Sequence, residues 1–452
     1  MTRTEQGAGP QPSTPAMPNH SAATGSQLAR SMLVVSMLAA LTGVARVAQD
    51  AAIAWRHGTD PVVDAYYLLL AVVGWPLAIA LSTLTLLAAP AEASLRRVDP
   101  AEAMRFRGEL LGAMLLAAAL AFPLSWLTLY AVAVGGWSGL APAAAKAAED
   151  GLSAFVAVVP LGLIGALLAA WLISTGRHVL TLLEALPPLV LIVALGLFHG
   201  TWLFWGTTAG IALQVGAMVV VLHRAGELPL PRIAFHSSGW QLFGRGAIVL
   251  LAGQMLFTLT PLVDPFFAAR LGDGNVAALG FANRLILGVQ GLVGIAIQRA
   301  GLPLLSKLAA HSPSEARHIA QGWALKAGLA GVLIAMVVVA LADTLVAILY
   351  ERGNFTAADR GQVESLLRWG MLQMPLFLSG LVLASAVVAL RGGPALALAS
   401  GVGLASKLIL SAVLTDTVGL AGLPIATAGM YGITTVMLWV ALRRSTGASE
   451  RK

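Results

Sequence analysis

The chain has 452 residues, of which 58% are hydrophobic and only 11% charged. Soluble domains carry about 25% charged residues, so this composition excludes an ordinary soluble domain and indicates a polytopic membrane protein. There is no cysteine, which excludes disulfides and thiolate metal sites. The formal net charge of +7 can indicate nucleic-acid binding, but Lys and Arg also accumulate in the cytoplasmic loops of membrane proteins, so no nucleic-acid partner is expected.

Residues 1–27 are rich in Gly, Pro, Ser and Thr and have almost no aliphatic side chains, which predicts a disordered cytoplasmic tail. At roughly 20 apolar residues per span, the remaining sequence predicts an all-α polytopic protein with about twelve transmembrane helices. The predicted spans are 28–55, 62–91, 108–134, 151–175, 178–199, 201–223, 243–270, 275–303, 323–350, 361–390, 394–416 and 420–442. They divide into two six-helix lobes, 28–225 and 243–443, with a cytoplasmic linker at 226–242 and a cytoplasmic tail at 444–452.

The distribution of charge orients these spans in the membrane. The tails and alternate loops hold 18 Lys and Arg residues, and the loops of the opposite side hold 5. Positive residues favour the cytoplasm, so both termini are predicted to be cytoplasmic.

The two lobes are predicted to be related by an internal repeat. The segments 58–69 and 176–187 align with 272–283 and 390–401, in both cases 214 residues later. A common offset in the same loop order indicates parallel repeats, with the substrate path expected between the lobes.

A short polar turn, "LYERGNFTAADR", interrupts the apolar chain at 349–360 on the predicted outer face. Gly353 allows a backbone conformation closed to other residues, and Thr356 with Asp359 can cap the following helix. The turn is therefore interpreted as a helix start, with a direct role in substrate binding as the alternative.

This turn resembles the ERGxFTxxD pattern of the MviN/MurJ family of lipid II flippases. The segment 42–67, "TGVARVAQDAAIAWRHGTDPVVDAYY", is similar to the family's first two helices, and 277–308 resembles its eighth. The resemblance implies two lobes around a site for a lipid-linked saccharide. The sequence departs from the family pattern: Gly43 and Gln49 stand where the family has arginines on the first helix, and the family usually has fourteen spans.

Ionisable side chains within the spans are the candidate site residues, because each costs about 2.5–3.5 kcal/mol at a helix centre. Arg46 and Asp50 are four residues apart on one helix face, which predicts either an internal ion pair or a site that binds pyrophosphate. Arg284 has no acidic neighbour one turn away, and Asp64 is a candidate partner. The resemblance places Arg46, Gln49, Asp50, Asp64, Asn283 and Arg284 in substrate binding. Arginine suits phosphate because its donors form a fixed fork.

Three further ionisable residues are candidates for ion pairing or coupling. Glu184 precedes Pro187 and Pro188, and is interpreted as a residue at a helix kink or a proton carrier. Members of the resembled family can bind sodium between helices seven and eleven. Lys407 falls near a position where the family often has asparagine, so we expect a buried Asp264–Lys407 ion pair in place of the metal. The alternative is that Lys407 snorkels and Asp264 caps a break before Pro265.

The leading hypothesis is an inner-membrane transporter that flips a polyprenyl-pyrophosphate-linked saccharide by alternating access, for peptidoglycan or cell-surface polysaccharide biosynthesis. Its expected partners are the lipid-linked saccharide, membrane lipids and cell-envelope biosynthesis proteins. The eight histidines lack metal-ligand spacing and no GxxxxGK[ST] motif occurs, so a non-enzymatic protein without cofactor, metal or direct ATP use is expected. The alternatives are a cation-coupled antiporter using Asp50, Asp64, Glu184 and Asp264, and a non-transporting scaffold of a polysaccharide-synthesis complex.

Overall fold

The computed structural model describes residues 20–175, 182–198, 200–390 and 392–449. Within these residues, all regular secondary structure is helical. The first lobe comprises α1 (His20–His57), α2 (Pro61–Thr83), the π-helix η1 (Leu84–Ala88), α3 (Ala89–Val98), α4 (Pro100–Ala133), α5 (Pro142–Phe155), α6 (Val158–Ser174), α8 (Leu186–Leu197) and α9 (Trp202–Arg224). The second comprises α10 (Gly239–Ala269), α11 (Asn275–His311), α12 (Pro313–Tyr350), α13 (Ala357–Gly370), α14 (Gln373–Ala389), α15 (Gly393–Val418), the 3-10 turn η2 (Gly419–Ala421) and α16 (Gly422–Ser449). The predicted all-α class is confirmed.

The described helices are long and apolar enough for a polytopic membrane protein. Six helical segments meet the length and composition required of a span, or eight when two bent helix pairs each count as one. The bent pairs are α5 with α6, at 49°, and α13 with α14, at 40°. The count of twelve spans stays a prediction.

Helix boundaries follow local sequence signals. A proline occupies the first or second position of α2, α4, α5, α12 and α15. The N–H groups of a first helical turn have no partner within the helix, so a proline, which has no N–H, loses no hydrogen bond there. The side chains of Asp99 and Ser312 accept hydrogen bonds from the first-turn amides of α4 and α12. Pro187 lies in the first turn of α8, directly after a turn at 184–185, so the prolines coincide with a helix start there, while residues 178–181 of the predicted fifth span lie outside the described residues.

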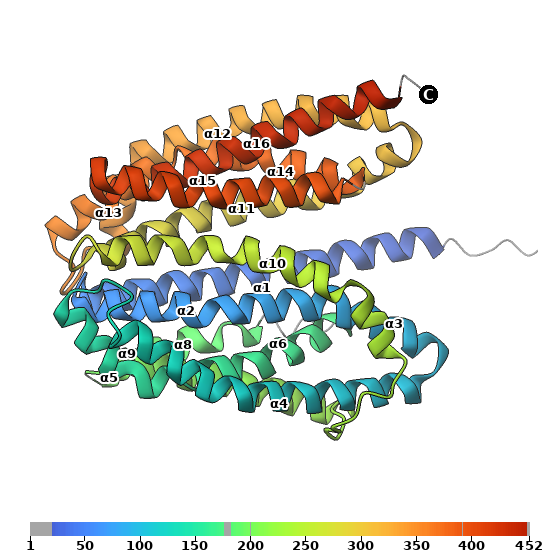
Figure 1. The fold of residues 1–452 in the computed structure, drawn as a ribbon, viewed down its shortest axis with the longest axis horizontal. Helices are drawn as coiled ribbons and strands as arrows, with labels where there is room; N and C mark the ends of the chain where they lie inside the picture. Colours follow the sequence, from blue (N-terminus) through green and yellow to red (C-terminus); the bar gives the residue numbers. More distant parts are fainter. Residues whose placement is uncertain (1–19, 176–181, 199, 391, 450–452) are drawn as a thin grey trace, which may run out of the picture.

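The two lobes lie side by side, with the first-lobe helices α1 and α2 and the second-lobe helix α10 next to the boundary between them (Figure 1). The beginning of α1 and the end of α16 lie at the same end of the molecule, and α13 lies at the opposite end (Figure 1). We call the end opposite the termini the distal end. Helix α1 already begins at His20, and residues 1–19 of the predicted tail lie outside the described residues.

The segment between the lobes is attached to α4 of the first lobe. The backbone N–H of Arg232 donates to the carbonyl of Gly108, 2.9 Å away. The Glu109 carboxylate accepts from the Ser237 amide at 3.1 Å and from the Trp240 indole at 2.8 Å. The linker is therefore hydrogen-bonded to the first lobe as far as Trp240.

Arg107, which was predicted in a cytoplasmic loop, is instead buried at the start of α4. Its guanidinium lies 2.7 Å from Glu92 and 3.7 Å from Glu227, and 5.2 Å from the centre of the Trp171 ring. Burial without these partners would strand a charge, so this cluster holds α3, α4, α6 and the linker together.

The polar turn at 349–360 connects the lobes at the distal end. Thr356 and Asp359 form a capping box at the start of α13, as the sequence predicted. The Asn354 amide donates to the carbonyl of Trp55 at 3.0 Å, and its side chain donates to that of Arg56 at 2.7 Å. Thr59 donates to Asp359 at 2.5 Å. The turn thus starts a helix and also binds the end of α1 in the other lobe.

Gly353→Ala is expected to destabilise this distal contact. Gly353 has φ +62°, and a Cβ there would overlap the carbonyl oxygen of Trp55. The left-handed conformation alone costs roughly 1–2 kcal/mol for a residue with a Cβ. Thermal unfolding in detergent should show a melting temperature lowered by several degrees.

The matched control for this substitution is Gly322→Ala on α12. Gly322 is exposed and a Cβ there meets nothing within 4 Å. Because Ala is the better helix former, its melting temperature should be unchanged or raised. Equal behaviour of the two variants would contradict the role assigned to the turn.

Candidate functional site

A buried ion pair joins the two lobes about 10 Å from the distal end of α1, at a rise of 1.5 Å per residue. Arg284 Nε of α11 lies 2.7 Å from Asp50 Oδ2 of α1. The Tyr67 hydroxyl of α2 donates to Asp50 Oδ1 at 3.2 Å. Asp50 is fully buried, whereas 30% of the Arg284 side chain is exposed. The Arg284 side chain is therefore only partly enclosed by the protein.

An aromatic cluster lies next to this pair. The Tyr67 ring packs edge-on against Phe281 of the second lobe, with 5.7 Å between centroids. Phe281 in turn contacts Tyr350 at 5.0 Å and Phe355 at 5.7 Å. All four rings belong to one buried core that draws on both lobes. This core closes the lobes together at the distal end.

Asp64 caps a helix of the opposite lobe. Its carboxylate accepts from the backbone amides of Gly274, at 2.5 Å, and Ala277, at 2.7 Å, in the first turn of α11. A carboxylate at a helix N-terminus both pairs free amides and complements the helix dipole. Asp64 of α2 therefore acts as the N-cap of α11, although it belongs to the other lobe.

Arg46 lies one turn before Asp50 on α1 and faces Glu184, in the turn before α8. The distance from Nη2 to Oε2 is 3.8 Å, and the two side chains are 53% and 42% exposed. A contact of this length between half-exposed groups is worth little. Gln49 of α1 and Asn283 of α11 directly precede Asp50 and Arg284 in the sequence, and both are partly exposed.

Two expected partnerships are wrong. Arg46 does not pair with Asp50, and Arg284 does not pair with Asp64. Helical spacing put Arg46 and Asp50 on one face, but Asp50 instead reaches Arg284 across the lobes. Asp64 is occupied by backbone amides, which no spacing within one helix reveals.

Asp264 and Lys407 form a second ion pair inside the second lobe. Lys407 Nζ of α15 lies 2.5 Å from Asp264 Oδ1 of α10. The ammonium also donates to the carbonyl of Leu423, at 3.0 Å, and to the hydroxyl of Thr427, both on α16. Lys407 is fully buried, so these three oxygen atoms match the three donors of its ammonium.

The four charged side chains between the lobes do not form a purely cationic site. The arginines at 46 and 284 each face a carboxylate, so the positive and negative charges of these four side chains cancel. An anion at this site would therefore compete with carboxylates that already pair with these arginines. Tyr67 was not singled out from the sequence as a site residue, although it lies in the segment that resembles the family's second helix.

Comparison with known proteins gives the family. The model of the family described as lipid II flippase MurJ matches residues 182–452, more than half of the chain. The chain belongs to the MurJ family. It is 27% identical over 276 residues to a probable lipid II flippase MurJ of Bdellovibrio bacteriovorus, covering 58% of this chain and 52% of that protein. It is 26% identical over 226 residues to a probable lipid II flippase MurJ of Vibrio cholerae, covering 49% of this chain and 42% of that protein. The chain thus spans about half the length of these relatives.

Solved structures share the fold over most of the chain. A lipid II flippase MurJ in an inward closed conformation superposes with a TM-score of 0.78, at 15% identity over 91% of this chain and 87% of that one. An inward-facing multidrug resistance MATE family transporter gives 0.75, at 15% identity over 91% and 96%. An outward-facing MATE structure gives 0.59, at 14% identity over 92% and 96%.

Single substitutions at the second ion pair are expected to be costlier than the double one. Asp264→Ala or Lys407→Ala leaves a buried charge unpaired and should destabilise by about 3–5 kcal/mol, while the double variant should cost less. Thermal unfolding of all three variants measures the coupling between the two residues.

The control for this cycle is the exposed pair of Lys146 and Glu149 on α5. Their side chains are 65% and 53% exposed, so removal of either should leave the melting temperature almost unchanged. Additive losses in the Asp264 and Lys407 double variant would overturn the assignment of a coupled buried pair.

Proposed function

We propose that the protein flips a polyprenyl-pyrophosphate-linked saccharide, lipid II or a related lipid-linked oligosaccharide, by alternating access. Membership of the MurJ family and the inter-lobe pair of Asp50 and Arg284 support this function. The pair carries the proposal, because it places an arginine, whose guanidinium suits a phosphate and whose side chain is partly exposed, at the boundary of two lobes that share the transporter fold.

Exchange of ionic partners gives the binding step a physical basis. A pyrophosphate that engages Arg284 takes it from Asp50, and a buried Asp50 then needs another partner. Arg46 lies one helical turn away on α1 and is held only weakly by Glu184, at 3.8 Å. We propose that Arg46 turns to Asp50 when Arg284 binds the phosphate. Arg284 then presents its positive charge to the phosphate, and the Asp50 carboxylate stays paired, now with Arg46.

The rearrangement to the opposite state must break the distal contacts. Asp64 has to leave the first turn of α11, and Asn354 has to leave the carbonyls of Trp55 and Arg56. These are hydrogen bonds, which water can replace on an opened surface at a net cost of about 1 kcal/mol each. These contacts can therefore be released without leaving their own polar groups unpaired.

The antiporter alternative receives less support from the structure. It requires carboxylates ready to take up a cation, yet Asp50 faces Arg284, Asp264 faces Lys407 and Asp64 accepts two amides. The likeness to a MATE transporter, at 15% identity, extends to the fold alone. We further propose that the Lys407 ammonium supplies the positive charge between α10 and α15, so that transport does not depend on sodium. Transport that requires sodium would contradict this.

Arg284→Ala is expected to lower flipping by about 10- to 100-fold, the equivalent of one lost charged hydrogen bond of roughly 1.5–3 kcal/mol. Arg284→Lys should restore part of the activity, because a lysine keeps the charge but loses the fork of donors. The measurement is flipping of a labelled lipid-linked saccharide in proteoliposomes. In cells depleted of this protein, analysis of the lipid-linked intermediate that accumulates identifies the substrate.

The control for Arg284 is Arg105→Ala, at the start of α4. Arg105 is 57% exposed and pairs only along its own helix, with Glu102 at 3.4 Å. Its loss should leave flipping unchanged. Full activity of a well-folded Arg284→Ala protein would remove the guanidinium from the mechanism.

We also propose that the protein lies in the inner membrane with both termini in the cytoplasm, as the distribution of Lys and Arg predicts. The chain has no cysteine, so single-cysteine variants report topology directly. Ala358→Cys at the exposed start of α13 should react with an impermeant thiol reagent added to spheroplasts, and Ala101→Cys at the exposed start of α4 should not. The reverse labelling pattern would overturn the orientation.

A further inference from the structure

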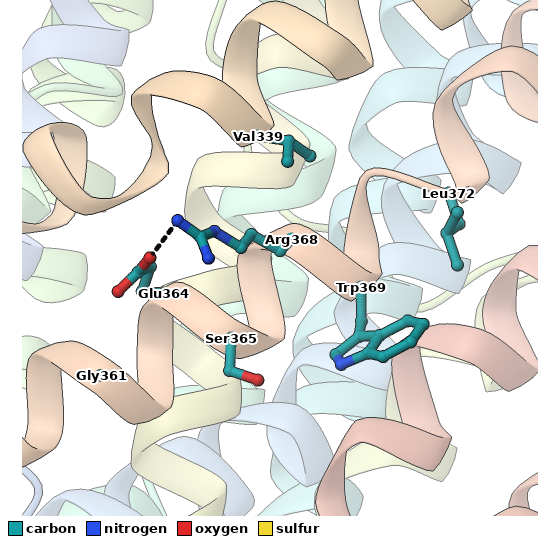
Figure 2. Close-up of a pocket in the computed structure, with 7 residues that line it drawn as sticks. All are labelled: Val339, Gly361, Glu364, Ser365, Arg368, Trp369 and Leu372. Carbon is teal, nitrogen blue, oxygen red and sulfur yellow. Dashed lines mark ion pairs between the residues drawn. The ribbon is translucent and has the colours of Figure 1, made fainter.

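A groove of about 510 Å³ lies between α12 and α13, away from the pair of Asp50 and Arg284. It is lined by Val339 of α12, by Leu372 just beyond α13, and by five residues of α13: Gly361, Glu364, Ser365, Arg368 and Trp369. Figure 2 shows Glu364 and Arg368 turned toward each other on consecutive turns, with the Ser365 hydroxyl and the Trp369 indole on the same stretch of α13. The groove thus combines a charged pair with apolar walls.

The groove lies on a helix surface that fits contact with lipid. Helix α12 exposes a series of large apolar side chains toward the distal half of its length: Leu333, Met336, Val337, Leu341 and Ile348. The same half of α12 carries Asp343, whose Oδ1 lies 3.2 Å from Arg360 Nε of α13. Glu364 and Arg368 are one and two helical turns further along α13. They therefore lie next to this polar pair, on the side away from the start of α13.

The charged pair is incompletely satisfied by the protein. Arg368 Nη2 lies 2.6 Å from Glu364 Oε1, but 52% of the Arg368 side chain is exposed, against 17% for Glu364. A pair of this kind in water adds little stability. Charges at the membrane level are costly unless they meet further polar groups. A ligand with one positive and one negative group, placed side by side, would satisfy both residues together.

We propose that this groove binds a zwitterionic membrane phospholipid whose headgroup ends in a primary ammonium. The lipid phosphate contacts the Arg368 guanidinium, and the ammonium donates to the Glu364 carboxylate. The Ser365 hydroxyl donates to a phosphate or ester oxygen. Leu372 and Val339 form the apolar wall along which an acyl chain lies, and Trp369 has the amphipathic ring that interfacial sites favour. This site is separate from the transport site and does not depend on the proposed function.

Charge complementarity favours this occupant over other lipids. An anionic lipid without an ammonium would meet Arg368 but would place its phosphate beside Glu364 with nothing to offer that carboxylate. A trimethylated headgroup carries a positive charge but has no N–H to donate to Glu364. The predicted order of affinity is therefore a primary-ammonium lipid first, with the trimethylated and the anionic lipids weaker by about tenfold, the scale of one charged hydrogen bond.

The test uses the full-length protein in nanodiscs of a fixed neutral lipid, titrated with phosphatidylethanolamine, phosphatidylcholine or phosphatidylglycerol. Lipids retained by the protein are quantified by native mass spectrometry. Glu364→Gln should erase the preference for phosphatidylethanolamine over phosphatidylcholine, and Arg368→Gln should weaken retention of all three lipids. Soluble phosphoethanolamine, added as a competitor, tests the headgroup alone and should compete only weakly, because it lacks the acyl chains.

The matched control is Lys146→Gln, which removes one residue of an exposed ion pair on α5 and should leave retention unchanged. Melting temperatures within a few degrees of the wild type show that the variants are folded. Equal retention of the three lipids by the wild type would overturn the proposal. So would a preference for phosphatidylglycerol, which would indicate a simple cationic site, or retention that neither substitution changes.

Discussion

The ion pair between Asp50 and Arg284 is the interaction on which the arrangement of the two lobes depends. Each charge is held inside the apolar bundle only because the other lies 2.7 Å away in the opposite lobe. Separation of the lobes at this level would leave a fully buried carboxylate without its partner, which costs about 3–5 kcal/mol when a buried pair is broken. The pair therefore stabilises the arrangement in which the lobes meet at the distal end.

The polar contacts of the distal end differ from this pair in how they can be released. Asp64 on the first turn of α11, and the 349–360 turn on the end of α1, are hydrogen-bonded contacts near a helix end. Water can take over such bonds when the surface opens. By contrast, the linker between the lobes is bound along α4 through Gly108 and Glu109, at the other end of the molecule. The lobes are thus joined by hydrogen bonds that water can replace at the distal end, and by the covalent linker, bound along α4, near the termini.

The second lobe contains a fully buried lysine side chain. The Lys407 ammonium is surrounded by a carboxylate, a carbonyl and a hydroxyl oxygen from α10 and α16. Oxygen ligands of these types also suit hard metal cations. Because the ammonium is covalently part of α15, its positive charge is always present, and the three helices stay joined without a dissociable ion. This physical difference underlies the proposed independence from sodium.

The sequence by itself determined those features that depend on near neighbours in the chain. Apolar length indicated membrane helices, and Thr356 with Asp359 indicated a cap at the start of a helix, which the structure has as a capping box. The predicted starts at 108 and 323 were several residues late, because α4 and α12 begin at Pro100 and Pro313 in polar sequence that apolar length does not detect. Lys407 could also be assigned to Asp264, because a buried ammonium needs a carboxylate and only one was placed well inside the spans of that lobe. The tertiary structure alone decided the partners of Arg284, Asp64 and Arg107. Their partners lie on other helices, in two of the three cases in the other lobe, and helical periodicity gives the face of one helix but not the helix that will pack against it.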